Sequence, residues 1–408
     1  MNAAPIAAAR PRNRRQLILE AAGRVFSERG YHAASMEEIA AGVGISAAAL
    51  YRHFPNKYAL FAECANVMVD RLAAVLGEVS SEAGPAEVLG AVTRVAVAHR
   101  ASGGLYRWEA RYLDHEDRRL LRVKFARVVG RVTEAVRRSH PADEAVRQDR
   151  PSPGGVRQDC PSPDAELRAA AALGAIGSIT THHVSIAQRR AEEVLLASAL
   201  RVIATDPAAT VGRAHSVELP AQPVPRTRRA EILAAAVPLF ARDGFAKVTN
   251  GQIAEAVGLV PSALYRHYPN KRDILVAACL QAAGLLAQAV DRSLDGVTDP
   301  HDAVVALAAT YVAYSFEHTA LTSVAEAEVV GLPADLQEPL IRAQRDHIAV
   351  WEQQLCLLRP ELAPRSARVL VHAGFGVVVE AGRRLRWRDT PEHRSAVTAL
   401  VVGALGLG

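Results

Sequence analysis

Two short segments of this 408-residue chain carry an aromatic hydroxyl, a guanidinium, an imidazole and an ammonium group at the same spacing. The first reads ALYRHFPNK from Ala49 to Lys57, and the second reads ALYRHYPNK from Ala263 to Lys271. Arginine can bond guanine through two hydrogen bonds, tyrosine and histidine suit phosphate oxygens, and lysine supplies a point charge. Both segments are therefore candidates for binding double-stranded DNA.

The two segments belong to one duplicated module. At a constant offset, residues 14–62 match residues 228–276 with 20 identities in 49 positions and no gap. A repeat of this kind sets the domain organisation of the whole chain. We assign helix-turn-helix DNA-binding domains to 10–57 and 226–271, helical regulatory bodies to 58–204 and 272–408, and a linker to 205–225. Half one is 10–204, and half two is 226–408.

Each copy predicts two short helices joined by a tight turn. Ser35 and Thr249 are followed three residues later by glutamate or glutamine, which is the spacing of a capping box. Gly44 permits the positive φ of a tight turn, and Ser46 can cap the second helix of copy one. Copy two has Val260 at that position, before a proline at the first helical position. Alone, the first segment also fits an alanine-rich surface helix, but its recurrence behind an arginine-rich approach favours a helix-turn-helix, whose second helix enters the major groove.

The arginine-rich start, the F-x-x-x-G-[YF] end of the first helix, the Ile-Ala and Val-Gly pairs and LYRHFPNK together resemble the DNA-binding domain of the TetR family of one-component repressors. Two units on one chain are similar to the single-chain tandem-TetR regulators of actinomycetes. The resemblance implies an all-α fold of two tandem units, each a three-helix DNA-binding domain plus a helical body for ligand binding and dimerisation. It also implies a transcriptional repressor that controls lipid uptake or catabolism and is released by a small apolar effector, of which a lipid or an acyl-CoA-like molecule is the expected class.

The resemblance assigns DNA-contacting roles to residues of both copies. Copy one departs from the family in the first turn of its recognition helix, which offers only methyl groups. The implied phosphate contacts are Ser35, Tyr51 and Lys57 with Thr249, Tyr265 and Lys271; the implied base contacts are Ala47, Ala48, Ala49, Arg52 and His53 with Pro261, Ser262, Ala263, Arg266 and His267; the basic approach is Arg14, Arg15, Arg228 and Arg229.

Aromatic and charged residues gather in the central helices of both bodies, although aromatic residues make up only 5% of the chain. They fit either ordinary core packing or, by the resemblance, a pocket for an apolar ligand oriented by a few polar groups. The candidate ligand-binding residues are Arg107, Trp108, Glu109, Arg111, Tyr112, Tyr311, Tyr314, Glu326, Trp351 and Phe375.

Composition argues against other classes of protein. The chain has no G-x-S-x-G, P-loop or H-E-x-x-H motif and no metal-spaced cluster, so we expect no enzyme, cofactor or metal site. Four separated cysteines and the lack of a secretory signal pattern predict a cytoplasmic protein. The uncharged stretch 169–188 predicts a buried helix that runs to about Ser185 and not a membrane span. The Pro-rich and charged repeat at about 141–164 predicts a disordered loop.

A single chain can supply both members of a pair. The linker is long enough to let the final helices of half one pack on those of half two, which predicts an intramolecular pseudo-dimer. Because the recognition helices begin differently in the two copies, an asymmetric operator is expected. The alternatives are a two-chain assembly with half one pairing half one and, as a class of function, an architectural DNA-binding protein without a ligand switch.

Overall fold

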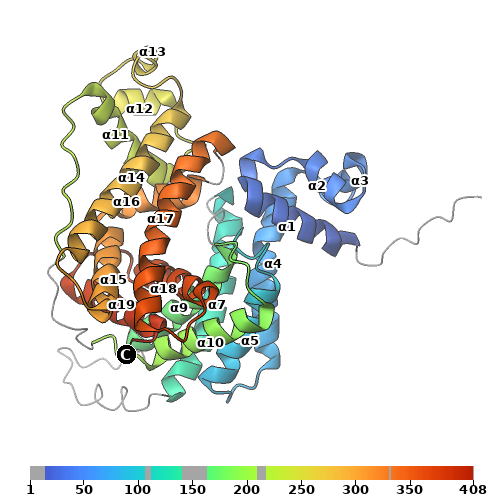
Figure 1. The fold of residues 1–408 in the computed structure, drawn as a ribbon. Helices are drawn as coiled ribbons and strands as arrows, with labels where there is room; N and C mark the ends of the chain where they lie inside the picture. Colours follow the sequence, from blue (N-terminus) through green and yellow to red (C-terminus); the bar gives the residue numbers. More distant parts are fainter. Residues whose placement is uncertain (1–13, 106–111, 140–162, 209–216, 330–331, 408) are drawn as a thin grey trace, which may run out of the picture.

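The computed structural model describes residues 14–105, 112–139, 163–208, 217–329 and 332–407, and every regular element among these residues is helical. The predicted all-α fold is thereby confirmed. Half one runs from blue to green and half two from yellow to red in Figure 1. The predicted disordered loop at about 141–164 lies outside the described residues up to residue 162, and its last two residues begin a helix at Pro163; residues 209–216 of the linker also lie outside them.

Each half begins with a three-helix domain, and a long helix then leads into the body. The helices of half one are α1 (Arg14–Ala33), α2 (Met36–Val43), α3 (Ala47–Tyr51), α4 (Lys57–Glu78), α5 (Pro85–Ala98), α7 (His115–Ser139), α9 (Pro163–Gly177), the 3-10 turn η2 (Ser178–Thr180) and α10 (Gln188–Ala204). Those of half two are α11 (Arg228–Asp243), α12 (Asn250–Ala256), α13 (Pro261–Leu264), α14 (Lys271–Leu294), α15 (Pro300–Glu317), α16 (Thr319–Glu328), α17 (Ala334–Leu358), α18 (Pro364–Arg384) and α19 (Pro391–Leu405).

The final two helices of each half pack together as a four-helix bundle, with α9 and α10 against α18 and α19. The closest approach joins Gly174 of α9 to Gly376 of α18, where a methyl group on either glycine would collide with the carbonyl oxygen of the other. This reciprocal contact is typical of a two-fold interface, in which equivalent surfaces face each other. Only glycine permits such close packing of the two backbones.

Polar groups add to the bundle. The Ser198 hydroxyl donates to the Ala404 carbonyl at 2.9 Å, and the Arg201 guanidinium donates to the Gly403 and Ala404 carbonyls at 3.2 and 2.9 Å. Ala404 lies in the last turn of α19, so its carbonyl is one of those without an amide partner four residues on within the helix, and both side chains donate to it.

The apolar residues form two separate cores. The larger core joins the first DNA-binding domain, through Phe26, Leu50 and Phe61, to body one and to the bundle helices of both halves. The smaller core joins the second DNA-binding domain, through Phe240 and Leu264, to the adjoining parts of α14 and α16. The two DNA-binding domains lie well apart, with α3 at the right edge and α13 at the top of Figure 1.

The helix predicted to run to about Ser185 ends earlier. It stops at Gly177, η2 follows, and residues 182–187 are not helical. The hydroxyls of Ser178, Thr180 and Thr181 donate to nearby backbone carbonyls, at 2.8, 2.8 and 2.7 Å, and such bonds compete with helix propagation. One described helix, α14, has the length and hydropathy of a membrane span, but Ile274, Leu275 and other residues along it are buried in the core of half two.

Candidate nucleic-acid interface

Short-range hydrogen bonds build the helix-turn-helix of copy one. The Ser35 hydroxyl accepts from the Glu38 amide at 3.1 Å, and the Glu38 carboxylate pairs with Arg29 at 3.1 Å. Gly44 has φ 69°, which a side chain would strain, and its turn leads to Ser46. The Ser46 hydroxyl caps α3 by accepting from the Ala49 amide at 3.2 Å.

Copy two reaches the same shape with different bonds. Thr249 and Gln252 form the complete predicted capping box, in which the Thr249 hydroxyl accepts at 3.2 Å and the Gln252 carboxamide oxygen accepts from the Thr249 amide at 2.8 Å. Gly258 has φ 67°. Val260 provides no side-chain cap for α13, which has a proline at its first position instead.

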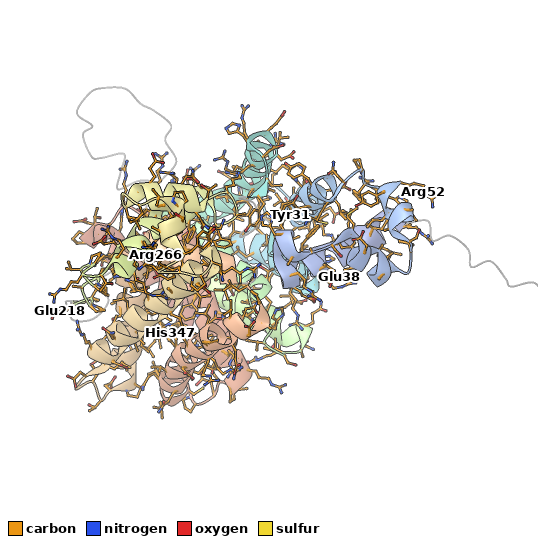
Figure 2. All side chains as sticks on the ribbon, turned by 90° about the horizontal axis from the view of Figure 1, so that it is seen from above. Tyr31, Glu38, Arg52, Glu218, Arg266 and His347 are labelled. Carbon is orange, nitrogen blue, oxygen red and sulfur yellow. The ribbon has the colours of Figure 1, made fainter. Side chains whose placement is uncertain are left out.

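Burial of two residues orients each recognition helix. Leu50 and Phe54 are buried in copy one, as are Leu264 and Tyr268 in copy two, so the residues between them face outward. Figure 2 shows Arg52 at the outer edge of half one. Of the predicted DNA contacts on and after these helices, Ala48, Tyr51, Arg52, Pro261, Ser262, Tyr265 and Arg266 are exposed, and Ala47, Ala49, His53, Ala263 and His267 are half-buried.

The two lysines proposed for phosphates already hold protein groups. The Lys57 ammonium donates to the His32 and Ala34 carbonyls at 3.2 and 3.1 Å, and burial lowers its pKa. Lys271 donates to the Phe245 and Val248 carbonyls at 2.7 and 2.6 Å. In both copies the ammonium therefore fastens the connection between the first two helices, and phosphate binding by these lysines stays a prediction.

The approach arginines differ in what they contact. Arg14 is half-buried, and Arg228 pairs with Glu231 at 2.6 Å. Arg15 and Arg229 face the C-terminal end of the recognition helix of their own copy.

Two tyrosines of body one, Tyr58 and Tyr112, form bonds or ring contacts next to the first DNA-binding domain. The Tyr58 hydroxyl, at the start of α4, donates to the Asp117 carboxylate of α7 at 2.5 Å and accepts from the Asp114 amide at 3.0 Å. Burial and these carboxylates raise the pKa of Tyr58. Tyr112, one of the predicted ligand-binding residues, stacks on Tyr31 of α1, with ring centroids 5.7 Å apart.

Three of the predicted ligand-binding residues come together in half two. The Tyr311 and Phe375 rings lie 4.5 Å apart between centroids, and the Trp351 ring lies 5.4 Å from that of Phe375. His347 joins this aromatic cluster, 5.6 Å from Phe375, and burial lowers its pKa to about 4. Sequence reasoning missed His347, although it lies one helical turn before Trp351.

The aromatic cluster of Tyr311, His347, Trp351 and Phe375 contains buried polar atoms without a hydrogen-bond partner. These are His347 Nε2 and Trp351 Nε1. Such atoms are costly in a core and need a reason, which a ligand or an ordered water supplies. Tyr314 lies apart from the cluster, and its hydroxyl donates to the Ala282 carbonyl at 2.8 Å. Arg107, Trp108, Glu109, Arg111 and the side chain of Glu326 lie outside the described residues.

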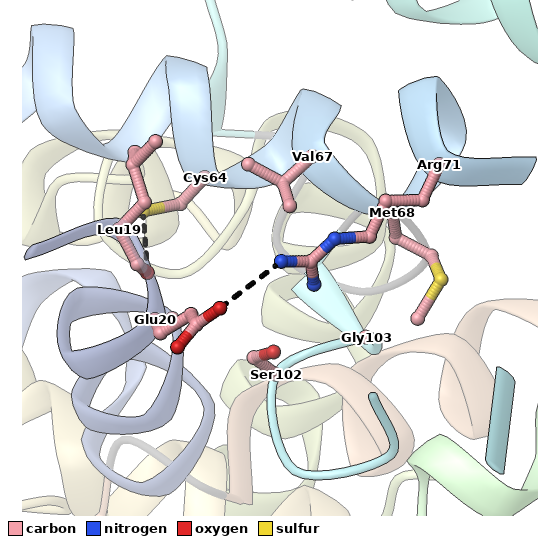
Figure 3. Close-up of a pocket in the computed structure, with 9 residues that line it drawn as sticks. Leu19, Glu20, Cys64, Val67, Met68, Arg71, Ser102 and Gly103 are labelled. Atoms are coloured by element: carbon pink, nitrogen blue, oxygen red, sulfur yellow. Dashed lines mark hydrogen bonds and ion pairs between the residues drawn. The ribbon is translucent and has the colours of Figure 1, made fainter. Parts of the chain in front are cut away.

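Two narrow crevices open in half one. The first lies between α1, α4 and the turn at Ser102, where Arg71 and Glu20 pair at 3.3 Å (Figure 3). The second lies between Met68, Phe125 and Leu173. They enclose about 270 and 300 Å³ of space, part of it open to solvent. Their walls approach so closely that neither holds a ligand of that size without rearrangement.

Comparison with known proteins places both helix-turn-helix units in one family. The model described as "Bacterial regulatory proteins, tetR family" matches residues 18–64 and 232–278. The chain is 48% identical to the transcriptional activator FasR of Mycolicibacterium smegmatis over 59 residues, which are 14% of this chain and 27% of that protein. It is 40% identical to the transcriptional repressor AcnR of Corynebacterium glutamicum over 80 residues, which are 20% of this chain and 40% of that protein.

These matches span less than half of each curated relative. Among solved structures, a TetR-family transcriptional regulator from Bordetella parapertussis is 22% identical and covers 45% of this chain and 96% of its own, with a TM-score of 0.41. AibR, solved with isovaleryl coenzyme A and operator DNA, is 23% identical over 45% of this chain and 96% of its own, with a TM-score of 0.33.

Proposed function

Because this chain carries two DNA-binding domains of the tetR family of bacterial regulatory proteins, we propose that a single polypeptide supplies both of the recognition helices that read an operator. The observation that carries the proposal is the combination of two exposed recognition helices with a four-helix bundle formed inside one chain. When two identical chains bind one operator, each chain supplies one reader, by which we mean a recognition helix with the arginine that follows it. Here the second reader is part of the same cytoplasmic protein.

The two readers carry different chemistry. Both present an exposed arginine, Arg52 or Arg266, which can bond guanine. Before that arginine, copy one presents alanines, whereas copy two presents Pro261 and Ser262. The two halves of the operator should therefore differ in sequence, and the operator should lack a palindrome.

Selection of duplexes from a random pool tests this function. We expect one enriched motif with two unlike half-sites. Arg52→Ala should relax the preference in one half-site and Arg266→Ala in the other, each at a cost of about 1–3 kcal/mol against the selected duplex. Arg365→Ala is the control, because this exposed arginine lies on α18 of the bundle. Binding that falls steeply with salt and enriches no motif would mean an architectural DNA-binding protein instead.

We further propose that the aromatic cluster binds the effector that releases the DNA. Its rings suit an apolar body, and the two buried nitrogens without partners suit a hydrogen-bonding group such as a carbonyl. An acyl-CoA or a fatty acid has both an apolar chain and a carbonyl group. We therefore favour a repressor of lipid uptake or catabolism that such a molecule releases from DNA.

A panel of acyl-CoA thioesters and fatty acids of increasing chain length tests the effector site. We expect one length range to weaken binding to the selected duplex. Trp351→Phe should keep the affinity for DNA and abolish this response, because it removes the indole nitrogen and keeps a ring. Tyr314→Phe, outside the cluster, is the matched control. A normal response from Trp351→Phe would assign Trp351 to the core alone.

A further inference from the structure

In both DNA-binding domains, one arginine of the first helix lies against the end of the recognition helix. The Arg15 guanidinium donates to the His53 carbonyl at 3.0 Å, and its central carbon lies 4.3 Å from the centroid of the Phe54 ring. Arg229 repeats both contacts in copy two. It donates to the His267 carbonyl and lies 3.8 Å from the centroid of the Tyr268 ring.

Each of these two arginines both donates a hydrogen bond to a backbone carbonyl and stacks on an aromatic ring, which a planar cation can do at once. The last carbonyls of a helix lack partners within the helix, and a cationic donor satisfies them. The face of the guanidinium stacks on an aromatic ring while its edge donates the hydrogen bond. A lysine ammonium has no planar face to stack on the ring while an edge donates the hydrogen bond.

The anchored carbonyl belongs to the base-reading segment itself. His53 directly follows Arg52, and Phe54 is the buried residue that anchors the end of the recognition helix. A bond to the His53 carbonyl therefore fixes the backbone from which the Arg52 and His53 side chains reach outward. The same holds for His267 and Arg266 in copy two.

Charge balance separates this role from phosphate binding. Arg15 also donates from Nε to the Glu63 carboxylate at 3.1 Å, so a carboxylate already neutralises it. The position that corresponds to Glu63 in copy two is Ala277, so Arg229 keeps its net charge. Both arginines nevertheless make the same carbonyl and ring contacts, which marks these contacts as the shared feature.

We infer that Arg15 and Arg229 are positioning residues that orient the base-reading side chains of their own copy and are not phosphate ligands. For the DNA readout, the inference rests on the proposed function. The test uses the full chain with Arg15→Lys, Arg15→Gln, Arg229→Lys and Arg229→Gln. Arg226→Gln, which removes one exposed positive charge just before α11, is the matched control.

Three quantities are measured for each variant: the affinity for the duplex selected by the wild-type chain, the affinity for a scrambled duplex, and the salt dependence of both. Lysine and glutamine variants should each lose about three- to ten-fold in affinity for the selected duplex. Affinity for the scrambled duplex and the salt slope should not change. Hydrogen exchange without DNA should become faster in peptides over 46–56 for Arg15 variants and over 260–270 for Arg229 variants, but not for Arg226→Gln.

An equal loss on both duplexes, with a salt slope lower by about one, would make these arginines phosphate ligands and overturn the inference. Full specificity in the lysine variants would overturn it as well, because charge alone would then suffice. If the wild-type chain prefers no duplex, the proposed function fails by itself. Hydrogen exchange then decides the positioning role, and unchanged exchange in the variants refutes it.

Discussion

The two DNA-binding domains have nearly the same internal construction but different attachments to the rest of the molecule. Domain one shares one continuous apolar core with both bodies, and directly after it the Tyr58 hydroxyl joins the start of α4 to α7. Domain two is built on a separate core with α16, and Arg272 occupies the position of Tyr58. Duplication thus kept the residues that shape the reader and changed those that connect it to its body. Signals from the bodies should therefore reach the two readers by different routes.

The largest effect is expected from adding one methyl group inside the four-helix bundle, because it forces apart the helices that join the two halves. Gly376→Ala should destabilise the chain by about 3 kcal/mol, since the Gly174 backbone cannot yield. Gly130→Ala is the control, because a Cβ there meets open space, and it should be neutral or stabilising by up to about 1 kcal/mol. Thermal unfolding measures both, and equal behaviour of the two variants would contradict the tight contact.

Acid should weaken the contact between the halves. His182 of half one stacks on His372 of half two, with centroids 4.1 Å apart, and burial lowers the pKa of His372 to about 4 and that of His182 well below its usual value. A lowered folded pKa favours the neutral ring, so stability is complete above the unfolded pKa near 6.5 and is lost as the pH falls toward 4.

Between about pH 7.5 and about pH 5, His372 should contribute a loss of roughly 2 kcal/mol in the free energy of unfolding. His372→Phe keeps a ring against His182 and should remove that part of the acid sensitivity, whereas His183→Gln, at an exposed position, should not. Urea unfolding at the two pH values measures the difference. Identical acid sensitivity in His372→Phe and the wild-type chain would refute the role of this pair.

Removing one hydroxyl should loosen the contact between α4 and α7 just after domain one and leave domain two unchanged. Tyr58→Phe loses the bond to Asp117 and the one from the Asp114 amide, at a cost of about 1–2 kcal/mol. Hydrogen exchange should rise in peptides over 112–117 and stay constant over the second DNA-binding domain. Tyr51→Phe, whose hydroxyl is exposed, serves as the control for stability. Unchanged exchange over 112–117 would show that apolar packing alone holds the two parts together.

The smallest expected effect compares the caps of the recognition helices. Ser46→Ala removes the cap of α3 and should cost about 1 kcal/mol, whereas Val260→Ser adds a cap to α13 and should gain a similar amount. The loss of burial is small because Val260 is 64% exposed. Local hydrogen exchange of each helix reports the change. A Val260→Ser variant that destabilises α13 would mean that the valine packs on a neighbour.

Local patterns predicted the readers well because their helices are short and specified by neighbouring residues. The capping serine and threonine, the turn glycines and the buried Leu50 and Phe54 all act within a few positions of one another. Sequence patterns did not predict the bond partners of Lys57 and Arg15, because backbone carbonyls of other segments leave no mark in residue types. The stacking of Tyr112 on Tyr31 was not predicted, because the two residues lie far apart in the chain. The early end of α9 was missed because the local bonds of Ser178, Thr180 and Thr181 compete with helix propagation.

Of the predicted ligand-binding residues, Tyr311, Trp351 and Phe375 were chosen for their aromatic rings alone, and their clustering depends on three helices that only the fold brings together. Tyr314 shares the residue type and lies one turn away on α15, yet it faces the other core. Residue type therefore predicted an aromatic cluster but did not predict which aromatic residues form it.

The number of chains on one operator tests the central claim most directly. Native mass spectrometry of the full chain with the selected duplex should give one 43.6 kDa chain per duplex, and footprinting should protect two unlike half-sites about one DNA turn apart. Two chains on each duplex, together with a perfect inverted repeat, would contradict the account, because each chain would then place only one of its two recognition helices on the operator.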